Sequence, residues 1–310
     1  MENTHQLTEL SNRLRKIEEA VASISANLAA LAQAHNQGVR EILFSQVAYL
    51  GDYRALTYLR SGQKIFVDTR SVDIGTHLMW GGQWEPEYVA AFLKLLKPGD
   101  KVLDVGANHG VYALLAAPKV APVGHVYAFE PSRNFCELIR ASVSVNGLDQ
   151  LVTVVNRAVA DREFDTDLLA DVHWSGGGHL IGEGGDAPQA DTNLLRETVH
   201  CITLDDYFPN PADTVNVVKM DVEGAEGLVL KGMASLIDRS PTLKIMMEFS
   251  PKMLARFPCN AVFVRDFLES RGFMCWTIRP DGSLAPAGWE SLLASPTALQ
   301  NIVLSRQGLR

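Results

Sequence analysis

Two acidic residues stand beside a glycine turn, and their placement suits a small cationic ligand. The turn follows an apolar run and contains Gly106 and Gly110. Asp104 lies two residues before the first glycine, and Glu130 ends the next apolar segment. Because glycine has no Cβ, the backbone can turn sharply there and approach a ligand closely. A strand, a glycine turn and a helix in this order are typical of nucleotide-binding α/β folds.

The glycine spacing separates two classes of cofactor. Dinucleotide sites use G-x-G-x-x-G, whose backbone amides and helix dipole face a pyrophosphate. Here Asn108 takes the place of the middle glycine, and Asp104 would repel a phosphate. S-adenosylmethionine (SAM) has no phosphate but carries an α-amino group, a sulfonium and a ribose. A carboxylate such as Glu130 can accept hydrogen bonds from the ribose hydroxyls. We therefore predict SAM, and not NAD, as the cofactor.

A second set of polar residues follows two later strands. Lys219 and Asp221 close one predicted strand, Glu223 follows in the turn, and Glu248 closes the next strand. Open α/β sheets bind ligands at the carboxyl ends of their strands, so we expect these groups at the edge that holds Asp104. Either Asp221 or Glu223 takes the proton of an acceptor hydroxyl, with Lys219 positioning it, or Asp221 and Glu248 bind Mg²⁺. The sequence leaves both mechanisms open.

A glycine-rich insertion, 161–200, is predicted to act as a lid over the acceptor. It contains His173, Trp174 and His179. A histidine beside an aromatic residue is suited to act as a base or to stack on a sugar, and we keep His179 as a candidate catalytic residue. An exposed loop histidine is the alternative. His109, inside the glycine turn, is expected to shape the turn.

Alternating strands and helices place these residues on a parallel sheet, so the expected fold class is α/β. The expected strands are 101–105, 125–130, 152–155, 215–220, 243–249, 273–278 and 301–305. The expected helices are 86–96, 111–117, 132–145, 225–237 and 261–271. Before them, we expect a helical segment at 39–60, a short strand at 64–68 and a loop at 75–84.

Residues 1–37 carry a heptad repeat. Its apolar positions are Leu7, Leu10, Leu14, Ile17, Val21, Ile24, Leu28 and Leu31, separated by alternating steps of three and four. Such an a/d seam predicts a coiled coil, because a lone helix would expose an apolar stripe to water. Leucine at a with isoleucine at d favours a trimer or tetramer over a dimer. The alternative is that the helix packs on its own catalytic domain.

The composition is that of a globular protein that does not bind nucleic acid nonspecifically. The chain has 310 residues, 47% hydrophobic and 21% charged, with a net charge of −8. No apolar run approaches the roughly 18 residues of a membrane span, so we expect a cytoplasmic protein. The four cysteines form neither a CxxC pair nor a zinc spacing and are expected to be buried thiols.

Five motifs resemble the FkbM-type class I methyltransferases, over roughly residues 80–305. They are V-L-D-V-G-A-N-H-G at 102–110, A-F-E-P-S at 128–132, N-R-A-V-A-D at 156–161, I-T-L-D-D at 202–206 and V-K-M-D-V-E-G-A-E at 218–226. The resemblance implies a doubly wound, Rossmann-like sheet, mostly parallel with an antiparallel last strand. It also implies methyl transfer from SAM to a hydroxyl of a sugar, a polysaccharide end or a polyketide.

The resemblance further implies roles for individual residues. Those that would hold the methionine part of SAM are Asp104, Gly106, Ala107, Asn108 and Gly110. Glu130 would hold the ribose, and Asn156, Arg157 and Ala158 would lie along the adenine. Glu85 stands where such enzymes often place a carboxylate near the cofactor.

These observations predict three parts and one main function. The parts are a coiled-coil helix (1–37), a helical and loop lead-in to the substrate site (38–90) and a methyltransferase domain (91–310). The expected activity is O-methylation of a glycan or of a small-molecule hydroxyl such as that of a polyketide. An NAD-linked oxidoreductase and a non-catalytic oligomeric scaffold are the alternatives.

Overall fold

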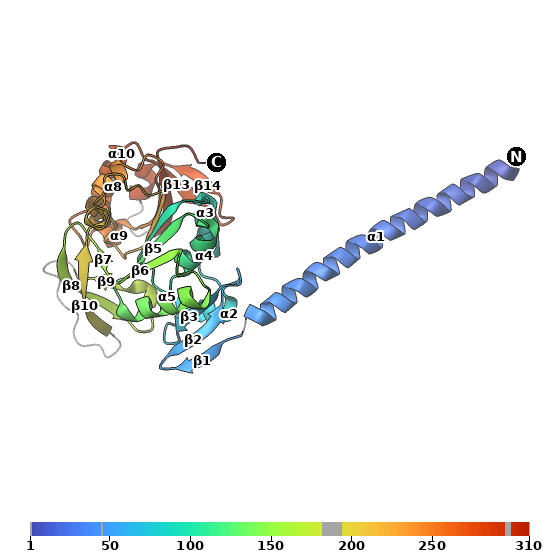
Figure 1. The fold of residues 1–310 in the computed structure, drawn as a ribbon. Coiled ribbons are helices and arrows are strands. Elements are labelled where there is room, and N and C mark those ends of the chain that lie inside the picture. Colours follow the sequence, from blue (N-terminus) through green and yellow to red (C-terminus); the bar gives the residue numbers. More distant parts are fainter. Residues whose placement is uncertain (1, 45, 182–193, 295–298, 310) are drawn as a thin grey trace.

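The computed structural model of the chain describes residues 2–44, 46–181, 194–294 and 299–309. A long helix leads into a mixed α/β body (Figure 1). The largest sheet has eight strands in the order β14-β13-β15-β12-β11-β4-β5-β6. Their bounds are β4 Lys101–Val105, β5 His125–Phe129, β6 Val152–Val155, β11 Val217–Met220, β12 Lys244–Phe249, β13 Met274–Ile278, β14 Leu284–Ala287 and β15 Gln300–Ser305.

The strand directions confirm the predicted fold. The neighbours β6, β5, β4, β11 and β12 run parallel, and β15 enters antiparallel between β12 and β13. All seven expected strands form, and β14 adds an edge strand that the sequence analysis did not anticipate. The sheet is therefore a doubly wound, Rossmann-like sheet whose last strand is antiparallel.

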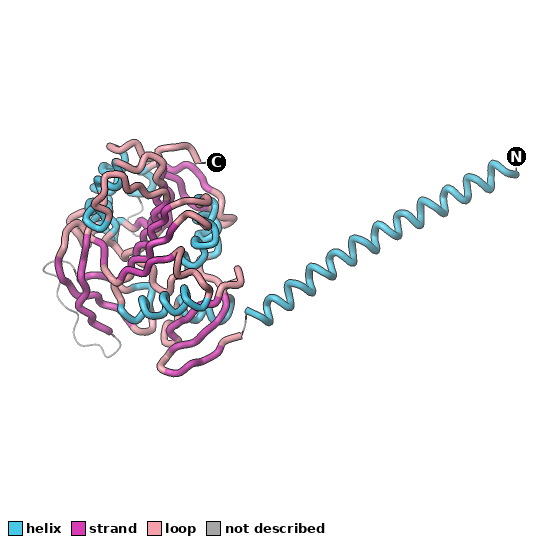
Figure 2. Tube along the Cα trace, in the orientation of Figure 1, coloured by secondary structure: helices cyan, strands magenta, loops and turns pink. Residues whose placement is uncertain are grey.

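Helices cover both faces of this sheet (Figure 2). They are α3 Pro86–Leu95, α4 Val111–Val120, α5 Arg133–Val145, α6 Leu204–Tyr207, α7 Glu226–Gly232, α8 Ala234–Asp238, α9 Pro251–Leu254, α10 Ala261–Glu269 and α11 Trp289–Leu293. Val102 of β4 belongs to the same hydrophobic cluster as Leu114 of α4, and Leu103 to the cluster of Leu236 of α8. Burial on both faces is the reason why Val102, Leu103 and Val105 of this parallel strand are apolar.

The segment after the first helix is a small antiparallel sheet, and the prediction of a helix across 39–60 is wrong beyond Phe44. The sheet consists of β1 Ala48–Gly51, β2 Arg54–Tyr58 and β3 Lys64–Asp68. Asp52 and Tyr53, with φ of 48° and 59°, make the turn between β1 and β2. Positive φ at both central positions is typical of the tightest hairpins. The short strand predicted at 64–68 is confirmed as β3.

A short helix, α2 (Ile74–Gly81), occupies most of the stretch 75–84 that was predicted as a loop. That prediction took Gly75 as a loop residue. In the structure a Cβ at Gly75 would lie 2.6 Å from the carbonyl oxygen of Asp68. This glycine therefore reflects close packing of α2 on β3.

The insertion 161–200 is largely a β-hairpin. Its strands, with a short one before it, are β7 Ala158–Val159, β8 Phe164–Asp171, β9 His179–Leu180 and β10 Leu194–Ile202, and they form a second sheet in the order β7-β10-β8-β9. A 3₁₀ turn, η1 (Ser175–Gly177), lies between β8 and β9. Part of the predicted glycine-rich lid, 182–193, falls outside the described residues.

The first helix, α1, spans Glu2–Phe44 and so continues past Gly38, near which we predicted its end. At about 1.5 Å per residue it is about 65 Å long, and it projects away from the body (Figure 1). Its apolar seam from Leu14 to Leu31 is 57% to 73% exposed, so this stretch does not pack on its own body. Among the described residues, no helix combines the length and apolar character that crossing a membrane requires.

Candidate functional site

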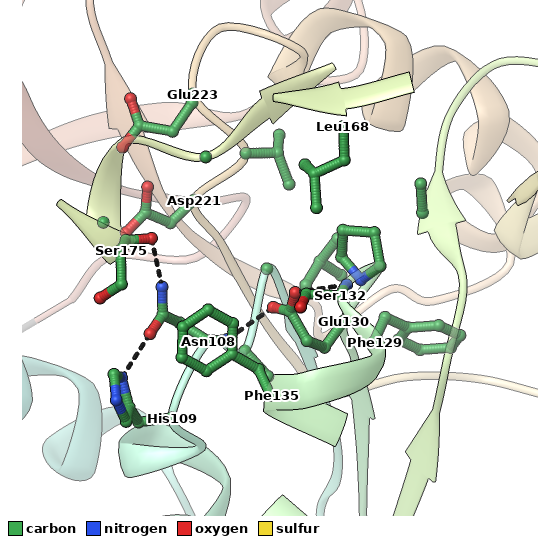
Figure 3. Close-up of a pocket in the computed structure, with 18 of the residues that line it drawn as sticks. Asn108, His109, Phe129, Glu130, Ser132, Phe135, Leu168, Ser175, Asp221 and Glu223 are labelled. Carbon is green, nitrogen blue, oxygen red and sulfur yellow. Dashed lines mark hydrogen bonds between the residues drawn. The ribbon is translucent and has the colours of Figure 1, made fainter. Parts of the chain in front are cut away.

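A pocket opens at the carboxyl ends of β4, β5 and β11, at the predicted edge (Figure 3). It encloses about 970 Å³ of space, part of which is open solvent. The predicted site residues that line it are Gly106, Ala107, Asn108, Glu130, Arg157, Ala158, His179, Lys219, Asp221 and Glu223. The predicted residues that lie behind this lining are Glu85, Asp104, Gly110, Asn156 and Glu248.

The backbone amides of the glycine turn donate hydrogen bonds to other groups of the protein. The amides of Gly106 and Ala107 donate to the carbonyl oxygen of Phe129 at 2.9 and 3.0 Å. The amide of Asn108 donates to Glu130 Oε2 at 2.7 Å, and that of Gly110 donates to Ala107 O at 2.7 Å. A dinucleotide turn must keep such amides free for a pyrophosphate. This turn does not offer that cradle.

Gly106 is required where two loops of the site meet. Its φ is 78°, a backbone conformation that other residues adopt at a cost. A Cβ at this position would overlap the backbone carbonyl oxygen of Asp221. The glycine thus lets the turn after β4 lie directly against the residues that follow β11. Gly110 has a packing role, because a Cβ there would lie 3.0 Å from the side chain of Ile139.

Glu130 is a buried carboxylate on the pocket wall. Its two oxygens accept from the amides of Asn108, at 2.7 Å, and Ser132, at 2.8 Å. Burial raises the pKa of Glu130 to about 7, although both amide bonds oppose that rise. Each carboxylate oxygen accepts more than one hydrogen bond, so Glu130 keeps capacity for two hydroxyl donors. Two neighbouring hydroxyl donors are what a ribose offers.

Asp104 lies under the turn with one unsatisfied oxygen. Its Oδ2 accepts from the amide of Ala113 at 3.0 Å. Its Oδ1 is buried without a hydrogen-bond partner among the described residues, and Lys219 Nζ stands 4.0 Å away. Burial raises the pKa of Asp104 to about 6, against the effect of Lys219. An unsatisfied carboxylate oxygen here fits an ammonium group of a ligand or a bridging water.

Lys219 is the cation at the chemical end of the pocket. It is 5% exposed, and its Nζ lies 3.4 Å from Asp221 Oδ2 and 4.7 Å from the ring centre of Tyr112. Burial acts to lower its pKa, but Asp221, Asp104 and Glu85 together hold the pKa above its usual value. Lys219 therefore stays charged, and its ammonium group stabilises negative charge next to it.

Glu85 lies behind this end of the pocket. Its Oε2 accepts from the hydroxyl of Tyr112 at 3.0 Å, and burial together with Asp221 raises its pKa. Glu85 precedes α3 with a φ of 45°. Its carboxylate is thus one of the groups that raise the pKa of Lys219. Trp84, its neighbour in sequence, lines the pocket.

Asp221, Glu223 and Glu248 form an acidic group beside Lys219. Each offers a carboxylate oxygen within 4.8 Å of the others. Burial and the charge of Asp221 raise the pKa of Glu223 to about 8 and that of Glu248 to about 9. At neutral pH both glutamates are therefore largely protonated, whereas Asp221 lies 3.4 Å from Lys219 Nζ and lines the pocket. Glu248 reaches the group from β12, behind the pocket lining.

The adenine side is apolar, and only part of the predicted set lies there. Arg157 and Ala158 line the pocket beside Phe129 and Leu168. The side chain of Asn156 is used elsewhere, because its Nδ2 donates to the carbonyl oxygens of Glu130, at 3.1 Å, and Pro131, at 2.7 Å. Asn156 therefore braces the loop that carries Glu130.

Sequence reasoning missed the contact between the turn and the insertion. Asn108 Nδ2 donates to the carbonyl oxygen of Ser175 at 2.8 Å (Figure 3). Ser175 Oγ donates to Asp73 Oδ1 at 3.1 Å and lies 2.8 Å from Ser71 Oγ. Buried serines and one aspartate, far apart in the chain, thus join the lead-in, the turn and the insertion. Serines in loops carry no signal that would single them out.

His109 and His179 are each held in place by hydrogen bonds. His109 is buried, and its Nδ1 lies 2.6 Å from Asn108 Oδ1, while its Nε2 accepts from the amide of Asp68 at 3.3 Å. Burial lowers its pKa to about 4, so it stays neutral and shapes the turn. His179 lines the pocket, and its Nδ1 lies 3.0 Å from the carbonyl oxygen of Gly177.

The residues present therefore fit SAM. Asp104 and the turn suit the methionine part, Glu130 suits the ribose, and the apolar wall suits the adenine. The amides of Gly106, Ala107, Asn108 and Gly110 are bonded within the protein and so are not free for a pyrophosphate.

Comparisons with known proteins place the chain in a family of this kind. Residues 104–275, more than half of the chain, match the methyltransferase FkbM domain, and the chain belongs to this methyltransferase family. A protein-L-isoaspartate O-methyltransferase from Aeropyrum pernix is 42% identical over 72 residues, which are 23% of this chain and 28% of that protein. A demethylmenaquinone methyltransferase from Symbiobacterium thermophilum is 35% identical over 85 residues, 26% of this chain and 33% of that protein. The chain thus spans a third or less of these curated relatives.

Solved structures show similarity at low sequence identity. A methyltransferase FkbM from Methylobacillus flagellatus is 14% identical, with a TM-score of 0.41, over 66% of this chain and 43% of that one. An O-methyltransferase from Streptomyces achromogenes involved in tomaymycin synthesis, solved in complex with SAM, is also 14% identical, with a TM-score of 0.40, over 71% of this chain and 78% of that one.

Proposed function

We propose that this chain is a SAM-dependent O-methyltransferase that methylates a hydroxyl of a sugar or glycan. The observation that carries the proposal is the use of the glycine turn. Its amides bond to Phe129 and Glu130, so they are not free for a phosphate, while Asp104 and Glu130 keep unused acceptor capacity on the pocket side of the sheet. This pattern supports SAM and disfavours an NAD-linked oxidoreductase.

The chain's own residues supply the base and its setting. When bound, SAM supplies an electrophilic methyl group whose leaving group is a neutral thioether. Asp221 accepts the proton of the acceptor hydroxyl while the new oxygen–carbon bond forms and the sulfur–carbon bond breaks. Lys219, whose Nζ lies 3.4 Å from Asp221 Oδ2, holds that carboxylate in place. Such positioned proton transfer typically contributes about 10² to 10⁴ in rate.

The chemical end of the pocket supports a neutral acceptor rich in hydroxyls. Asp221 and Glu223 line it, and the pocket lining also contains two cationic side chains, those of Lys219 and Arg157. Carboxylates accept hydrogen bonds from hydroxyls and repel phosphates and carboxylates. Trp84, also in the lining, offers an aromatic face of the kind on which sugar rings stack. A polyketide or another small-molecule hydroxyl is the second acceptor class.

The N-terminal helix supports self-association. Its exposed seam consists of Leu14, Ile17, Val21, Ile24, Leu28 and Leu31. Contiguous exposed apolar stripes of this kind are rare on monomers, and the heptad spacing suits another copy of the same helix. We infer a trimer or tetramer, which would gather several pockets and favour repeated methylation of a polymeric acceptor.

A transfer assay tests the proposed activity. The full chain is incubated with SAM carrying a labelled methyl group and with panels of neutral glycans, anionic sugars and polyketide alcohols. We expect label in a neutral glycan at a hydroxyl oxygen. Label confined to carboxyl or nitrogen positions, or no transfer to any hydroxyl, would contradict the proposal.

A further inference from the structure

Three carboxylates meet where the parallel strands β11 and β12 end. Met220 of β11 lies opposite Met247 of β12, so Asp221 and Glu248 follow at adjacent positions. Glu223 comes from the turn after β11, and one oxygen from each of the three side chains lies within 4.8 Å of the others. Figure 3 shows Asp221 and Glu223 on the same side of the pocket.

Glu248 is buried without a partner. Its side chain is 9% exposed, and within the described parts of the chain no hydrogen bond or ion pair reaches its carboxylate. Its oxygen points into the group formed with Asp221 and Glu223. A carboxylate that is largely removed from water and has no protein partner is favourable only when it is protonated or when water or an ion reaches it. This side chain is the observation that separates the group from an ordinary acidic surface patch.

The nearby cation does not satisfy the group. Lys219 Nζ is 3.4 Å from Asp221, which is longer than the roughly 2.8 Å of a strong charge-assisted bond. The same ammonium also lies 4.0 Å from Asp104. One lysine is thus shared between two aspartates, and in the described part of the chain no cation lies within ion-pair distance of Glu223 or Glu248.

The backbone holds Glu223 in an uncommon conformation. Its φ is 55°, in the left-handed region that non-glycine residues rarely adopt. Strain of this kind persists when the surrounding structure imposes it, and it is concentrated at functional sites. Here Glu226 holds the turn, because its Oε1 accepts from the amides of Val222 and Gly224 at 3.1 and 3.3 Å. The turn thus fixes the side chain of Glu223 beside Asp221.

The spacing fits an ion with oxygen ligands. Mg²⁺ binds oxygen at about 2.1 Å and Ca²⁺ at about 2.3–2.6 Å, so oxygens on opposite sides of such an ion are about 4–5 Å apart. The three oxygens lie within 4.8 Å of one another. A set made of carboxylates alone favours Mg²⁺, Mn²⁺ or Ca²⁺ over metals that prefer nitrogen or sulfur.

We propose that Asp221, Glu223 and Glu248 bind one divalent, oxygen-preferring cation such as Mg²⁺ or Mn²⁺. Asp221 and Glu248 are the two candidate Mg²⁺ ligands that the sequence predicts, and Glu223 is a third. Because Asp221 and Glu223 line the pocket, the ion would stand where an acceptor with neighbouring hydroxyls could reach it. The site needs only one oxygen of Asp221, so its other oxygen stays available to accept the hydroxyl proton. That role rests on the proposed function, whereas the cation site rests on the three side chains.

Binding of Mn²⁺ to the full chain tests the site. Free Mn²⁺ is followed by electron paramagnetic resonance during a titration, with Mg²⁺ as competitor. We expect one saturable Mn²⁺ per chain, and affinity at least about tenfold weaker in Glu223→Gln and in Glu248→Gln. Glu163→Gln is the matched control, because it removes an exposed carboxylate next to His200 and should leave the affinity unchanged.

Two results would overturn the site: no saturable binding in the wild type, or wild-type affinity in Glu248→Gln. Glutamine has the same shape and relieves the repulsion, so both variants are expected to fold, and circular dichroism checks this. Methyl transfer is measured in parallel with and without EDTA. Methyl transfer without any Mn²⁺ binding would contradict the cation site and support the proposed function. Mn²⁺ binding without transfer to any acceptor would support the cation site and contradict the proposed function.

Discussion

The side-chain amide of Asn108, in the glycine turn, donates a hydrogen bond of 2.8 Å to the carbonyl oxygen of Ser175, in the insertion. The other end of the same side chain, Oδ1, lies 2.6 Å from His109 Nδ1. One residue thus links the predicted cofactor turn to the segment that lies over the pocket. Cofactor binding and the position of the insertion are therefore expected to depend on each other.

Replacing Asn108 by glycine tests that link. Asn108 has a φ of 50°, which glycine adopts without strain, so Asn108→Gly removes the side chain alone. Loss of a buried hydrogen bond costs about 1–3 kcal/mol, and we expect SAM affinity to fall about tenfold. Hydrogen exchange should also become faster in residues 175–180. Unchanged affinity together with unchanged exchange would show that the link has no role.

Replacing Asp221 by asparagine should remove the base and keep the cofactor site. We expect Asp221→Asn to lower kcat by about 10² or more, with SAM affinity within about threefold of the wild type. Asp213→Asn is a matched control, because the Asp213 side chain is 31% exposed and bound to Lys101, while that of Asp221 is 30% exposed. Full kcat in Asp221→Asn, or an equal loss in the control, would contradict the assignment.

The stability of the protein without ligand should fall as pH rises towards neutrality. Burial raises the pKa of Glu130 from 4.5 to about 7, so its contribution is complete below the unfolded pKa and is lost as pH rises through the folded value. The loss is at most about 3.4 kcal/mol and occurs between about pH 4.5 and about pH 7. Thermal unfolding from about pH 4.5 to about pH 7.5 should show a falling Tm, with a shallower slope in Glu130→Gln. A Tm that rises over this interval would contradict the burial of charge.

The seam of α1 predicts the oligomeric state. Deletion of residues 2–37 should reduce the mass in light scattering from three or four chains to one. Ile24→Glu places a charge on the seam and should have the same effect, whereas Ser23→Glu places it on an exposed position beside the seam. A monomeric full-length chain would exclude the coiled coil. A deletion variant that keeps the full oligomer would locate the interface elsewhere.

The sheet and the turn could be predicted because several levels of the sequence agree there. Val102, Leu103 and Val105 are apolar since both faces of their strand are buried, and Gly106 is required by a positive φ and by the approach of Asp221. These constraints act within a few residues and leave a readable pattern. The order and direction of the strands follow from the alternation of strands and helices.

The errors lie where short segments depend on distant contacts. Val47, Leu50 and Leu56 suit a helix or a strand by spacing alone, and the hairpin turn uses Asp52 and Tyr53 in place of the more usual Asn-Gly. Gly75 was predicted in a loop because its neighbour across the fold is not visible in sequence. The bond between Asn108 and Ser175 joins residues 67 positions apart, which no local pattern encodes.

Calorimetric titration of the full chain with SAM tests the central claim most directly, with S-adenosylhomocysteine and NAD as comparison ligands. The structure predicts saturable binding of SAM and of its demethylated product at one site per chain, weakened at least about tenfold in Glu130→Ala, and no binding of NAD. Saturable binding of NAD, or no binding of SAM by a folded chain, would contradict the account.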